Sequence, residues 1–401
     1  MAEQSGNFFK KLLKISMVSI FSLILLSVIA LIFAHGSFKT KVYLEPWSKE
    51  YHKKFDDPRI KVISHGLLAP NAHNMQSWRI VLDPNNNMKF KLFLDEKRLL
   101  PATDPLHRQS VISQGTFIEL IVIAAGKLGY VADIELFPAG EFGSSPSDEE
   151  IHKTPTAEIT LIPSKSEEPS VYAFIFERVT TRTPYLPKPL SKEQIDRLTA
   201  LNDFDSIGVI VFQDSDELAQ LTDLAVKGVD IESRLQATMN ESHVVLRFNE
   251  YQKNKYRSGL TMSSQGFSWV KQFLIESGAT LFPPSLEQEG KIWREAERVR
   301  IEKTPAYVMI FSDKNDRATQ VKVGRLYSRI QLTGTAMGLS MQPTMQITEE
   351  YPEMKELYEN VTERFVRNGQ TVQMLFRVGT SEKKIEHSPR RDVMEVIDNK
   401  N

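Results

Sequence analysis

A run of twenty residues without a charged side chain, from Ile15 to Ala34, constrains this chain more than any other feature of its sequence. At about 1.5 Å per residue, a helix of this length crosses a hydrocarbon core about 30 Å thick. The run therefore predicts a membrane-spanning anchor over residues 15–34. We expect a short cytoplasmic tail over residues 1–14 and a linker over residues 35–55.

The charges around this run bear on its orientation. Lysines before the run favour a cytoplasmic N-terminus, which places the remainder of the chain on the periplasmic side. Further lysines follow the run, so the asymmetry alone does not decide the orientation. The lysines before it are Lys10, Lys11 and Lys14, and those after it are Lys39, Lys41, Lys49, Lys53 and Lys54.

A cleaved signal peptide is the alternative to an anchor. Its apolar core is usually about 7–15 residues long and ends in a small-x-small cleavage site. The run from Ile15 is longer, and Ile32-Phe33-Ala34 does not fit such a site. We therefore expect the segment to remain as an anchor.

The overall composition indicates a folded protein without a polyanionic partner. Of 401 residues, 41% are hydrophobic and 25% charged, and the formal net charge is -1. These proportions are ordinary for globular domains, and near-neutrality provides no broad field that would attract nucleic acid. The absence of cysteine excludes disulfides, thiolate nucleophiles, iron–sulfur clusters and cysteine-ligated zinc.

Several common catalytic motifs are missing from the sequence. The eight histidines form no i, i+4 pair and no His-Glu-x-x-His motif, so we expect no metal site. The sequence also contains no phosphate-binding Gly-x-x-x-x-Gly-Lys loop, no Gly-x-Ser-x-Gly elbow and no Gly-x-Gly-x-x-Gly turn. Nucleotide hydrolase, esterase and dinucleotide-binding functions therefore lack support.

Beyond residue 55 the patterns alternate between helix and strand, which predicts an α+β fold. Residues 78–82 and 89–94 predict a hairpin, and the apolar segment Val111–Tyr130 predicts a central helix closed by Gly129. Further apolar runs predict strands at Ala157–Ile162, Ile207–Phe212, Ala306–Phe311 and Val372–Val378.

A weak internal repeat is present. The segment Ser113–Gly129 resembles Leu326–Leu339 in position and in its small residues, and a strand-like stretch follows each. Similar helices arise often by chance, so this texture alone leaves duplication and coincidence open.

Two separated segments have side chains suited to one ligand. Residues 68–78 form a loop rich in small amides after Pro70, and residues 178–182 place two guanidinium groups and two hydroxyls together, which suits a phosphate dianion. Simpler interpretations stay open. Arg178 and Arg182 at i, i+4 spacing fit a solvated helix face, the loop asparagines fit turn capping, and Trp78 fits core packing.

These segments resemble the nitroreductase superfamily, and more closely its Acg-type branch of fused, single-chain members. Family enzymes are typically homodimers that bind FMN at the subunit interface, with an Arg-x-Ser-x-Arg/Lys clamp from one subunit and a Pro-Ser-x-x-Asn-x-Gln-Pro-Trp loop from the other. Here one chain contains both. Asn71 stands where Ser is usual, Ser77 where Pro is usual, and Thr180 keeps the clamp hydroxyl.

The resemblance implies a particular architecture. We expect two fused nitroreductase-like halves, residues 56–165 and 170–398, with mixed sheets and central helices, behind one N-terminal transmembrane helix. The product would be a monomeric pseudo-dimer with a single FMN.

Two more segments extend the resemblance. Residues 338–346 are similar to a family stretch whose backbone approaches flavin N5, where Met345 would supply the amide and Gln346 replaces a usual Gly. The segment Ser388-Pro389-Arg390-Arg391 resembles the last basic element of the Acg branch. The implied cofactor-binding residues are Pro70, Asn71, Asn74, Gln76, Arg178, Thr180, Arg182, Pro343, Met345, Gln346, Arg390 and Arg391.

The stretch from about residue 232 to 300 is rich in Phe, Trp and Met interleaved with charges, and is predicted to be helical. We expect it to form a lid over the second half, with plain helical packing as the alternative.

The apolar run and the resemblance together imply a membrane-anchored, FMN-dependent oxidoreductase that reduces a small organic, quinone-like or nitro-like acceptor, with NAD(P)H as candidate donor. We name no catalytic side chain, because the flavin itself carries out the electron transfer. An FMN-storing or FMN-sensing protein and an inactive, membrane-tethered interaction domain remain the alternatives.

Overall fold

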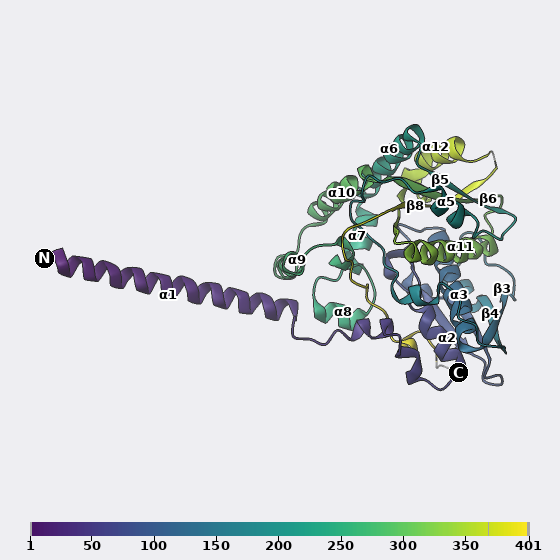
Figure 1. Cartoon of the computed structure of the whole chain (residues 1–401), viewed down its shortest axis with the longest axis horizontal. Helices are drawn as coiled ribbons and strands as arrows, with labels where there is room; N and C mark the ends of the chain where they lie inside the picture. Colours follow the sequence, from purple (N-terminus) through teal and green to yellow (C-terminus); the bar gives the residue numbers. More distant parts are fainter. Residues whose placement is uncertain (1, 368, 399–401) are drawn as a thin grey trace.

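The computed structural model describes residues 2–367 and 369–398. Its first helix, α1 (Ala2–His35), projects alone from the globular body (Figure 1). Within it, Leu13–His35 is 23 residues long with a mean hydropathy of 2.8, and the most apolar part has no protein packed around it. By length and composition this helix is able to cross a bilayer.

The body contains two antiparallel four-stranded sheets with the same strand order. The first sheet has the order β1-β2-β4-β3 and the second has the order β5-β6-β8-β7. The first consists of β1 (Trp78–Leu82), β2 (Lys89–Leu94), β3 (Tyr130–Leu136) and β4 (Pro155–Pro163). The second consists of β5 (Ile207–Phe212), β6 (Ala306–Ser312), β7 (Ser340–Pro343) and β8 (Thr371–Gly379).

The strand predictions agree with these sheets. The expected hairpin forms with Trp78 opposite Leu94 and Leu82 opposite Phe90. The predicted strand at residues 207–212 coincides with β5, and the other three lie within β4, β6 and β8. One expectation was wrong, because the named strands pair only in antiparallel fashion and do not form mixed sheets.

Two buried helices lie against each other between the sheets (Figure 1): α3 (Arg108–Leu128) and α11 (Arg317–Ala336). The predicted central helix corresponds to α3, which begins three residues earlier than expected. Gly129 caps it in the left-handed conformation, at φ 85°, which glycine adopts without strain. The α3 helix is also apolar enough to span a membrane, but 78% of its most apolar window is buried inside the protein.

The remaining elements connect and cover these layers. The other α-helices are α2 (Pro58–Gly66), α4 (Asp148–Lys153), α5 (Lys192–Thr199), α6 (Ser215–Glu232), α7 (Gln236–Val245), α8 (Glu250–Tyr256), α9 (Trp269–Leu281), α10 (Leu286–Glu302) and α12 (Lys355–Phe365). The short 3-10 helices are η1 (Val42–Trp47), η2 (Tyr51–Lys54), η3 (Ala72–Asn74), η4 (Glu96–Arg98), η5 (Tyr172–Phe176), η6 (Met262–Gln265), η7 (Gln346–Thr348), η8 (Pro352–Met354) and η9 (Val393–Glu395).

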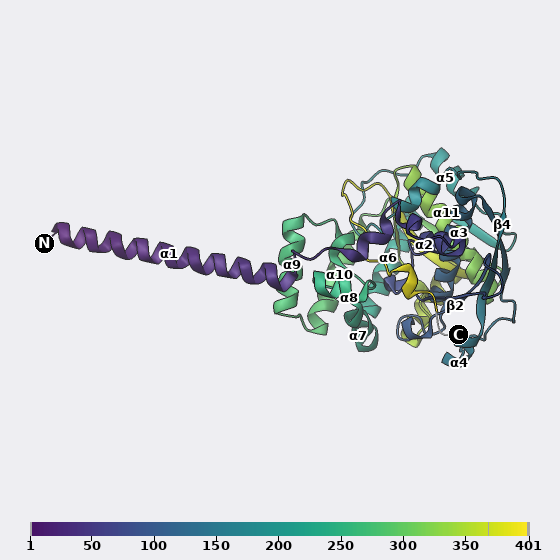
Figure 2. The ribbon, with the colours of Figure 1, turned by 90° about the horizontal axis from the view of Figure 1, so that it is seen from below.

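We call residues 236–302, with helices α7 to α10, the cap. In both views the cap helices lie on the side of the body from which α1 projects (Figures 1 and 2). The cap therefore occupies most of the region for which a lid was expected.

The packing divides the chain differently from the expected halves. The C-terminal residues Val393, Val396 and Ile397 belong to the core of the first half, not the second. Ile80 in β1 donates its N–H to Val396 O at 2.8 Å and accepts from Asp398 N at 2.7 Å. The backbone groups at the open edge of β1 and those of the tail thus form hydrogen bonds with each other, which explains why the tail returns to the first half.

The expected linker over residues 35–55 also contributes to this core. Trp47 and Tyr51 are buried in it, and the Tyr51 hydroxyl donates to Asp392 at 3.0 Å. This segment and the C-terminal tail therefore hold each other against the first half.

Candidate functional site

One pocket brings together the two motif segments that are more than a hundred residues apart in sequence. It is lined by Pro70, Asn71 and Asn74 from the loop, by Arg178, Thr180 and Arg182, and by Arg390 from the C-terminal tail. Most of the residues singled out from sequence therefore face one space.

The segment with the paired arginines is not helical, so a solvated helix face is the wrong interpretation of its spacing. Thr181 donates its backbone N–H to Met341 O of β7 at 3.1 Å, and Arg182 donates its own to Ser264 O of the cap at 2.9 Å. The segment thus runs between the second sheet and the cap, with Arg178 and Arg182 turned to the pocket.

Arg178 and Arg390 meet at the loop. Arg178 Nη1 donates to Leu68 O at 2.5 Å, and Arg390 Nη2 donates to the same oxygen at 3.4 Å. Arg178 Nε donates to Gln331 of α11 at 2.7 Å, while Arg390 Nη1 donates to Asn74 Oδ1 at 2.6 Å. The guanidinium groups of Arg178, from the 178–182 segment, and of Arg390, from the C-terminal tail, therefore converge on the backbone of the loop at Leu68.

Among the residues that the structure describes, Arg178, Arg182 and Arg390 form no ion pair with a carboxylate. Glu297 acts on Arg182 electrostatically, and Glu386 shares the pocket lining. Burial lowers the pKa of Arg178 to about 10, and burial together with the nearby Arg178 lowers the pKa of Arg390 well below its ordinary value. Arg390 Nε is buried without a hydrogen-bond acceptor. Buried charges without a counter-ion are costly, so this arrangement suits an anionic ligand.

The loop has an unusual backbone. His73, Asn74 and Gln76 adopt positive φ values of 45°, 55° and 53°. Asn71 Oδ1 accepts the Gln76 N–H at 2.8 Å, and Asn74 Nδ2 donates to Gly259 O at 3.1 Å and to Pro389 O at 3.0 Å. Asn71 and Asn74 therefore stabilise the turn and also line the pocket, so turn capping and ligand contact are compatible roles for them.

Gln76 and Arg391 support the loop from outside the pocket. Gln76 Oε1 accepts the Arg391 N–H at 2.8 Å, and Arg391 Nη1 donates to Gln76 O at 3.0 Å. Trp78 is fully buried, donates to Ser113 O at 3.1 Å and packs on Phe117, which agrees with a core role.

The stretch after β7 does not line this pocket. Pro343 ends β7, Met345 is packed in the second core, and Gln346 lies against Gly228 of α6. Met341 of β7, just before this stretch, accepts the backbone hydrogen bond of Thr181 and so connects the stretch to the pocket wall.

One aromatic residue of the pocket, Trp47, was not predicted from the sequence. The Trp47 ring lies 4.8 Å from Arg390 Cζ and 5.7 Å from Arg178 Cζ, and it stacks on His387 at 4.0 Å. Its Nε1–H donates to Ser388 O at 2.8 Å. Burial and the two arginines lower the pKa of His387 to about 4, so its ring is neutral at pH 7. An isolated tryptophan in an expected linker carries no local signal of this role.

The rest of the lining comes from the cap and the tail, together with Val179 between the two arginine positions. The cap residues are Gly259, Leu260, Thr261, Ser263 and Ser264, which no sequence motif revealed, and the tail residues are Glu386 and Ser388. The cap residues belong to the connection between α8 and α9.

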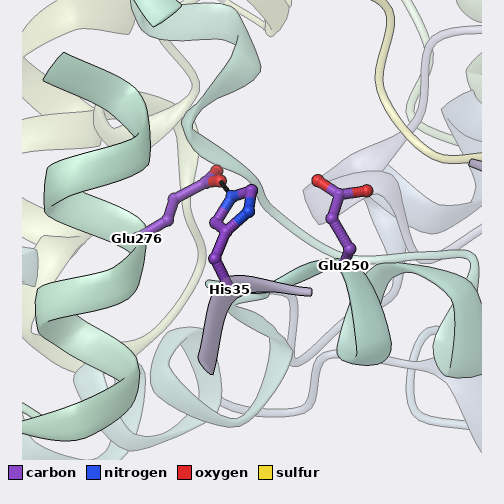
Figure 3. A group of neighbouring side chains, drawn as sticks. All are labelled: His35, Glu250 and Glu276. Carbon is purple, nitrogen blue, oxygen red and sulfur yellow. Dashed lines mark hydrogen bonds and ion pairs between the residues drawn. The ribbon is translucent and has the colours of Figure 1, made fainter. Parts of the chain in front are cut away.

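A second cluster lies where α1 meets the cap. One ligand-type atom each from His35, Glu250 and Glu276 lies within 4.8 Å of the others (Figure 3). Lys253 Nζ donates to Glu250 at 3.0 Å and to Glu276 at 2.8 Å, so an ammonium group already provides the positive charge there.

Comparisons with known proteins found relatives that are named as nitroreductases. No family model matches the chain. A Mycobacterium tuberculosis H37Rv protein named as an NAD(P)H nitroreductase is 24% identical over 340 residues, 84% of this chain and 90% of the relative. The protein named acg from the same strain is 25% identical over 342 residues, 82% of this chain and 92% of the relative. PigM of a Serratia species, also named as an NAD(P)H nitroreductase, is 22% identical over 299 residues, 71% of this chain and 79% of the relative.

Similar solved structures carry related names. NfnB of Mycobacterium smegmatis, solved with NADPH, is 14% identical, covers 55% of this chain and 94% of its own, and gives a TM-score of 0.34. A nitroreductase of Bacteroides fragilis with bound FMN is 9% identical, covers 56% of this chain and 95% of its own, and gives a TM-score of 0.33.

Proposed function

We propose that this chain, a member of the nitroreductase superfamily by its similarity to the proteins above, is an FMN-dependent oxidoreductase that reduces a small organic acceptor. The acceptor would be quinone-like or nitro-like, and NAD(P)H is the candidate electron donor. The relatives' names support this activity, and the pocket supports the cofactor.

The observation that carries the proposal is the set of three guanidinium groups around one pocket that form no ion pair in the described part of the chain. A phosphate dianion would offset two of their three positive charges, and the planar fork of arginine matches its oxygens. The unpaired Arg390 Nε and the Thr180 hydroxyl add donors at the same place. The residues present therefore fit the phosphate end of FMN.

Each part of the site would have a separate task. FMN, when bound, supplies hydride or electron transfer. Arg178, Arg182 and Arg390 would hold its phosphate, and Asn71 and Asn74 would present amide groups beside it. Gln76 and Arg391 would act by fixing the loop. The family resemblance assigns Pro343, Met345 and Gln346, which lie outside the lining of this pocket, to the flavin ring.

The two halves are proposed to derive from a duplication. The two sheets share one strand order, and the central helices begin with equivalent buried arginines. Arg108 donates to Val372 O in the second half at 3.0 Å, and Arg317 donates to Leu106 O in the first half at 2.8 Å. Each half thus reaches into the other, as the subunits of a dimer would, and we propose a single FMN at their junction.

We further propose that α1 anchors the protein in a membrane, with the body on the periplasmic side. The body would be a monomeric pseudo-dimer, and the cap would act as a lid. Support for the lid comes from the cap residues Gly259–Thr261, which form part of the pocket wall.

A titration tests the cofactor assignment. The full chain, purified in detergent, should be yellow or should bind added FMN. The Arg178→Ala/Arg182→Ala variant should bind FMN more weakly by about 2–4 kcal/mol, roughly a 30- to 1,000-fold loss. Arg197→Ala, which removes an exposed arginine of α5, is the matched control and should bind normally. Equal affinity in all three proteins would place the phosphate elsewhere.

Turnover separates the enzyme from its alternatives. Steady-state consumption of NAD(P)H with a nitroaromatic or quinone supports the oxidoreductase. Bound flavin without turnover supports storage or sensing, and a colourless protein that cannot be reconstituted supports an interaction domain.

A further inference from the structure

The cap helix α9 has its polarity reversed with respect to an ordinary surface helix. Glu276 and Ser277 are fully buried, whereas Trp269 is 78% exposed and Phe282, directly after the helix, is 80% exposed. A helix on a water-soluble surface normally shows the opposite arrangement, with its apolar side chains facing the core.

The exposed apolar residues of α9 form a continuous stripe. Val270, Leu274 and Leu281 are exposed at helical spacing, and Gly278 lies between them with open space beyond it. The exposed face of α9 contains no acidic residue, because its only one, Glu276, is buried, and its only basic residue is Lys271. Contiguous exposed apolar surface of this kind marks an interaction site.

The orientation of α9 relative to α1 suggests what covers this face. In Figure 1, α1 runs along the picture while α9 is seen nearly end-on, and in Figure 2 α9 runs crosswise to α1. Both views place α9 beside the end of α1, at the edge of the body nearest that helix. A helix crosswise to a membrane-spanning helix lies along the membrane plane.

Buried polar contacts fix α9 to the end of α1. His35 Nε2, in the last turn of α1, lies 2.9 Å from Glu276 Oε2 (Figure 3). The His35 ring packs edge-on against Phe273 at 5.2 Å. Lys253 joins Glu276 to Glu250 of α8, and Tyr43 donates to Glu250 at 2.8 Å. The position of α9 relative to the anchor is therefore set by a hydrogen-bonded network and not by the exposed face.

Aromatic and basic groups surround the same junction. Phe38 is exposed just after α1 and packs near Phe33 and Tyr251, with Lys39 Nζ 5.2 Å from the Tyr251 ring. Aromatic rings and lysines gather at the headgroup level of membranes, where apolar bodies and polar tips are both satisfied.

We propose that α9 lies in the headgroup–acyl boundary of the bilayer that α1 spans, with Trp269, Val270, Leu274, Leu281 and Phe282 in contact with lipid. This inference rests on the proposed membrane anchoring. A helix with one apolar face and a basic residue beside it is the usual form of such an interfacial element. Because α8 and α9 flank Gly259–Ser264, the lipid contact also holds one wall of the pocket at the membrane surface.

The absence of cysteine permits a direct test. Single-cysteine variants Leu274→Cys and Phe282→Cys of the full chain are labelled with a nitroxide and reconstituted into phosphatidylcholine–phosphatidylglycerol vesicles. Ile162→Cys, an exposed apolar position of β4 on the side of the body away from α1, is the matched control. Leu25→Cys, within the apolar run of α1, reports on the anchor.

Labels at 274 and 282 should collide with oxygen several-fold more, relative to a water-soluble nickel chelate, than the label at 162. Ratios equal to that at 162 would show α9 in water, and low collision with both reagents would show a protein contact. Either result overturns the proposal. An aqueous label at Leu25 would instead refute the anchor itself, so the two failures are distinguishable.

Intrinsic fluorescence provides a second measurement without labels. In vesicles of brominated phosphatidylcholine, Trp269→Phe should abolish most of the quenching seen in the unmodified chain, because Trp47 and Trp78 are buried in the body and Trp293 packs partly buried against the core beside the second sheet. Unchanged quenching in Trp269→Phe would contradict the lipid contact.

Discussion

Gly115 of α3 and Gly324 of α11 face each other's backbones reciprocally. A Cβ on Gly115 would lie 1.9 Å from Val321 O, and a Cβ on Gly324 would lie 1.9 Å from Ile112 O. In each case the contacted carbonyl precedes the opposite glycine by three residues. The two helices are therefore related by an approximate two-fold axis at this contact, and their backbones touch where only a hydrogen fits.

Alanine at either glycine should separate the central helices. We expect Gly115→Ala and Gly324→Ala each to lower the free energy of unfolding by about 3 kcal/mol, because the clash is with backbone and cannot be relieved by a rotamer change. Thermal unfolding in detergent measures the loss. Gly126→Ala, in the same α3 helix, meets its neighbours at an ordinary 3.4 Å and should be neutral or stabilising. Equal effects at positions 115 and 126 would contradict the close contact.

Two arginines, the half-buried Arg182 and the buried Arg377, should respond differently to the same substitution. Arg182 donates its side chain to Ser264 Oγ and faces the pocket, so Arg182→Met should weaken FMN binding by about 2 kcal/mol while leaving the ligand-free protein nearly as stable. Arg377, outside the pocket, donates to Thr183 O at 2.8 Å and Gln342 Oε1 at 2.9 Å. Arg377→Met should instead destabilise the fold by about 3 kcal/mol, because buried acceptors lose their donor. FMN titration and thermal unfolding of both variants distinguish the two roles, and a reversed pattern would contradict the assignment.

The sequence predicted what local signals specify. The hairpin at β1 and β2 has alternating arms around a polar turn, and β5 is a short apolar run between turn residues, so both were predicted to within a residue or two. Arg178 and Arg182 were singled out because they are close in sequence, whereas Arg390, more than two hundred residues later, was included only through the family resemblance.

Long-range packing could not be predicted in this way. The glycine contact depends on which helices meet, and Trp47 reaches the pocket only because the tail pairs with β1. The cap wall depends in the same way on how α8 and α9 fold back. None of these contacts leaves a pattern within a short window of sequence.

Trp47 should support ligand binding through the arginines beside it. Trp47→Leu removes the aromatic face near Arg178 and Arg390 and the bond to Ser388 O, so FMN affinity should fall by about 1–2 kcal/mol. Trp293→Leu, in α10 and outside the pocket lining, should leave FMN affinity unchanged. Fluorescence titration of FMN against both variants is the measurement, and normal affinity in Trp47→Leu would remove the tryptophan from the site.

His65 should make stability depend on pH. Its ring is buried between Lys61 O at 2.8 Å and the Tyr172 hydroxyl at 3.0 Å, and burial lowers its pKa to about 4. The unfolded chain takes up a proton near its ordinary pKa of about 6.5 and the folded chain does not, so acidification favours unfolding. The loss begins below about pH 6.5 and is complete below about pH 4.

The non-titrating variant His65→Gln isolates this contribution, because other titrating groups cancel in the comparison. The stability of the unmodified chain relative to His65→Gln should fall by up to about 1.4 kcal/mol per pH unit between pH 6 and 4.5. Denaturant unfolding at several pH values measures this difference. Parallel pH curves for the two proteins would mean that His65 is protonated equally in both states.

The C-terminal tail should be required for the first half, even though it follows the second half in sequence. Val393 is fully buried in the first core, and its backbone N–H donates to the Tyr51 hydroxyl at 3.1 Å. Val393→Ala should lower the free energy of unfolding by about 2 kcal/mol through the cavity it leaves. Met394, the next residue, is 43% exposed, so Met394→Ala should change stability by less than about 0.5 kcal/mol. Because Arg390 lies only three residues before Val393, Val393→Ala should also weaken FMN binding, which a titration of the folded variant detects. Equal stability of the two variants would show that the tail is not held in the first core.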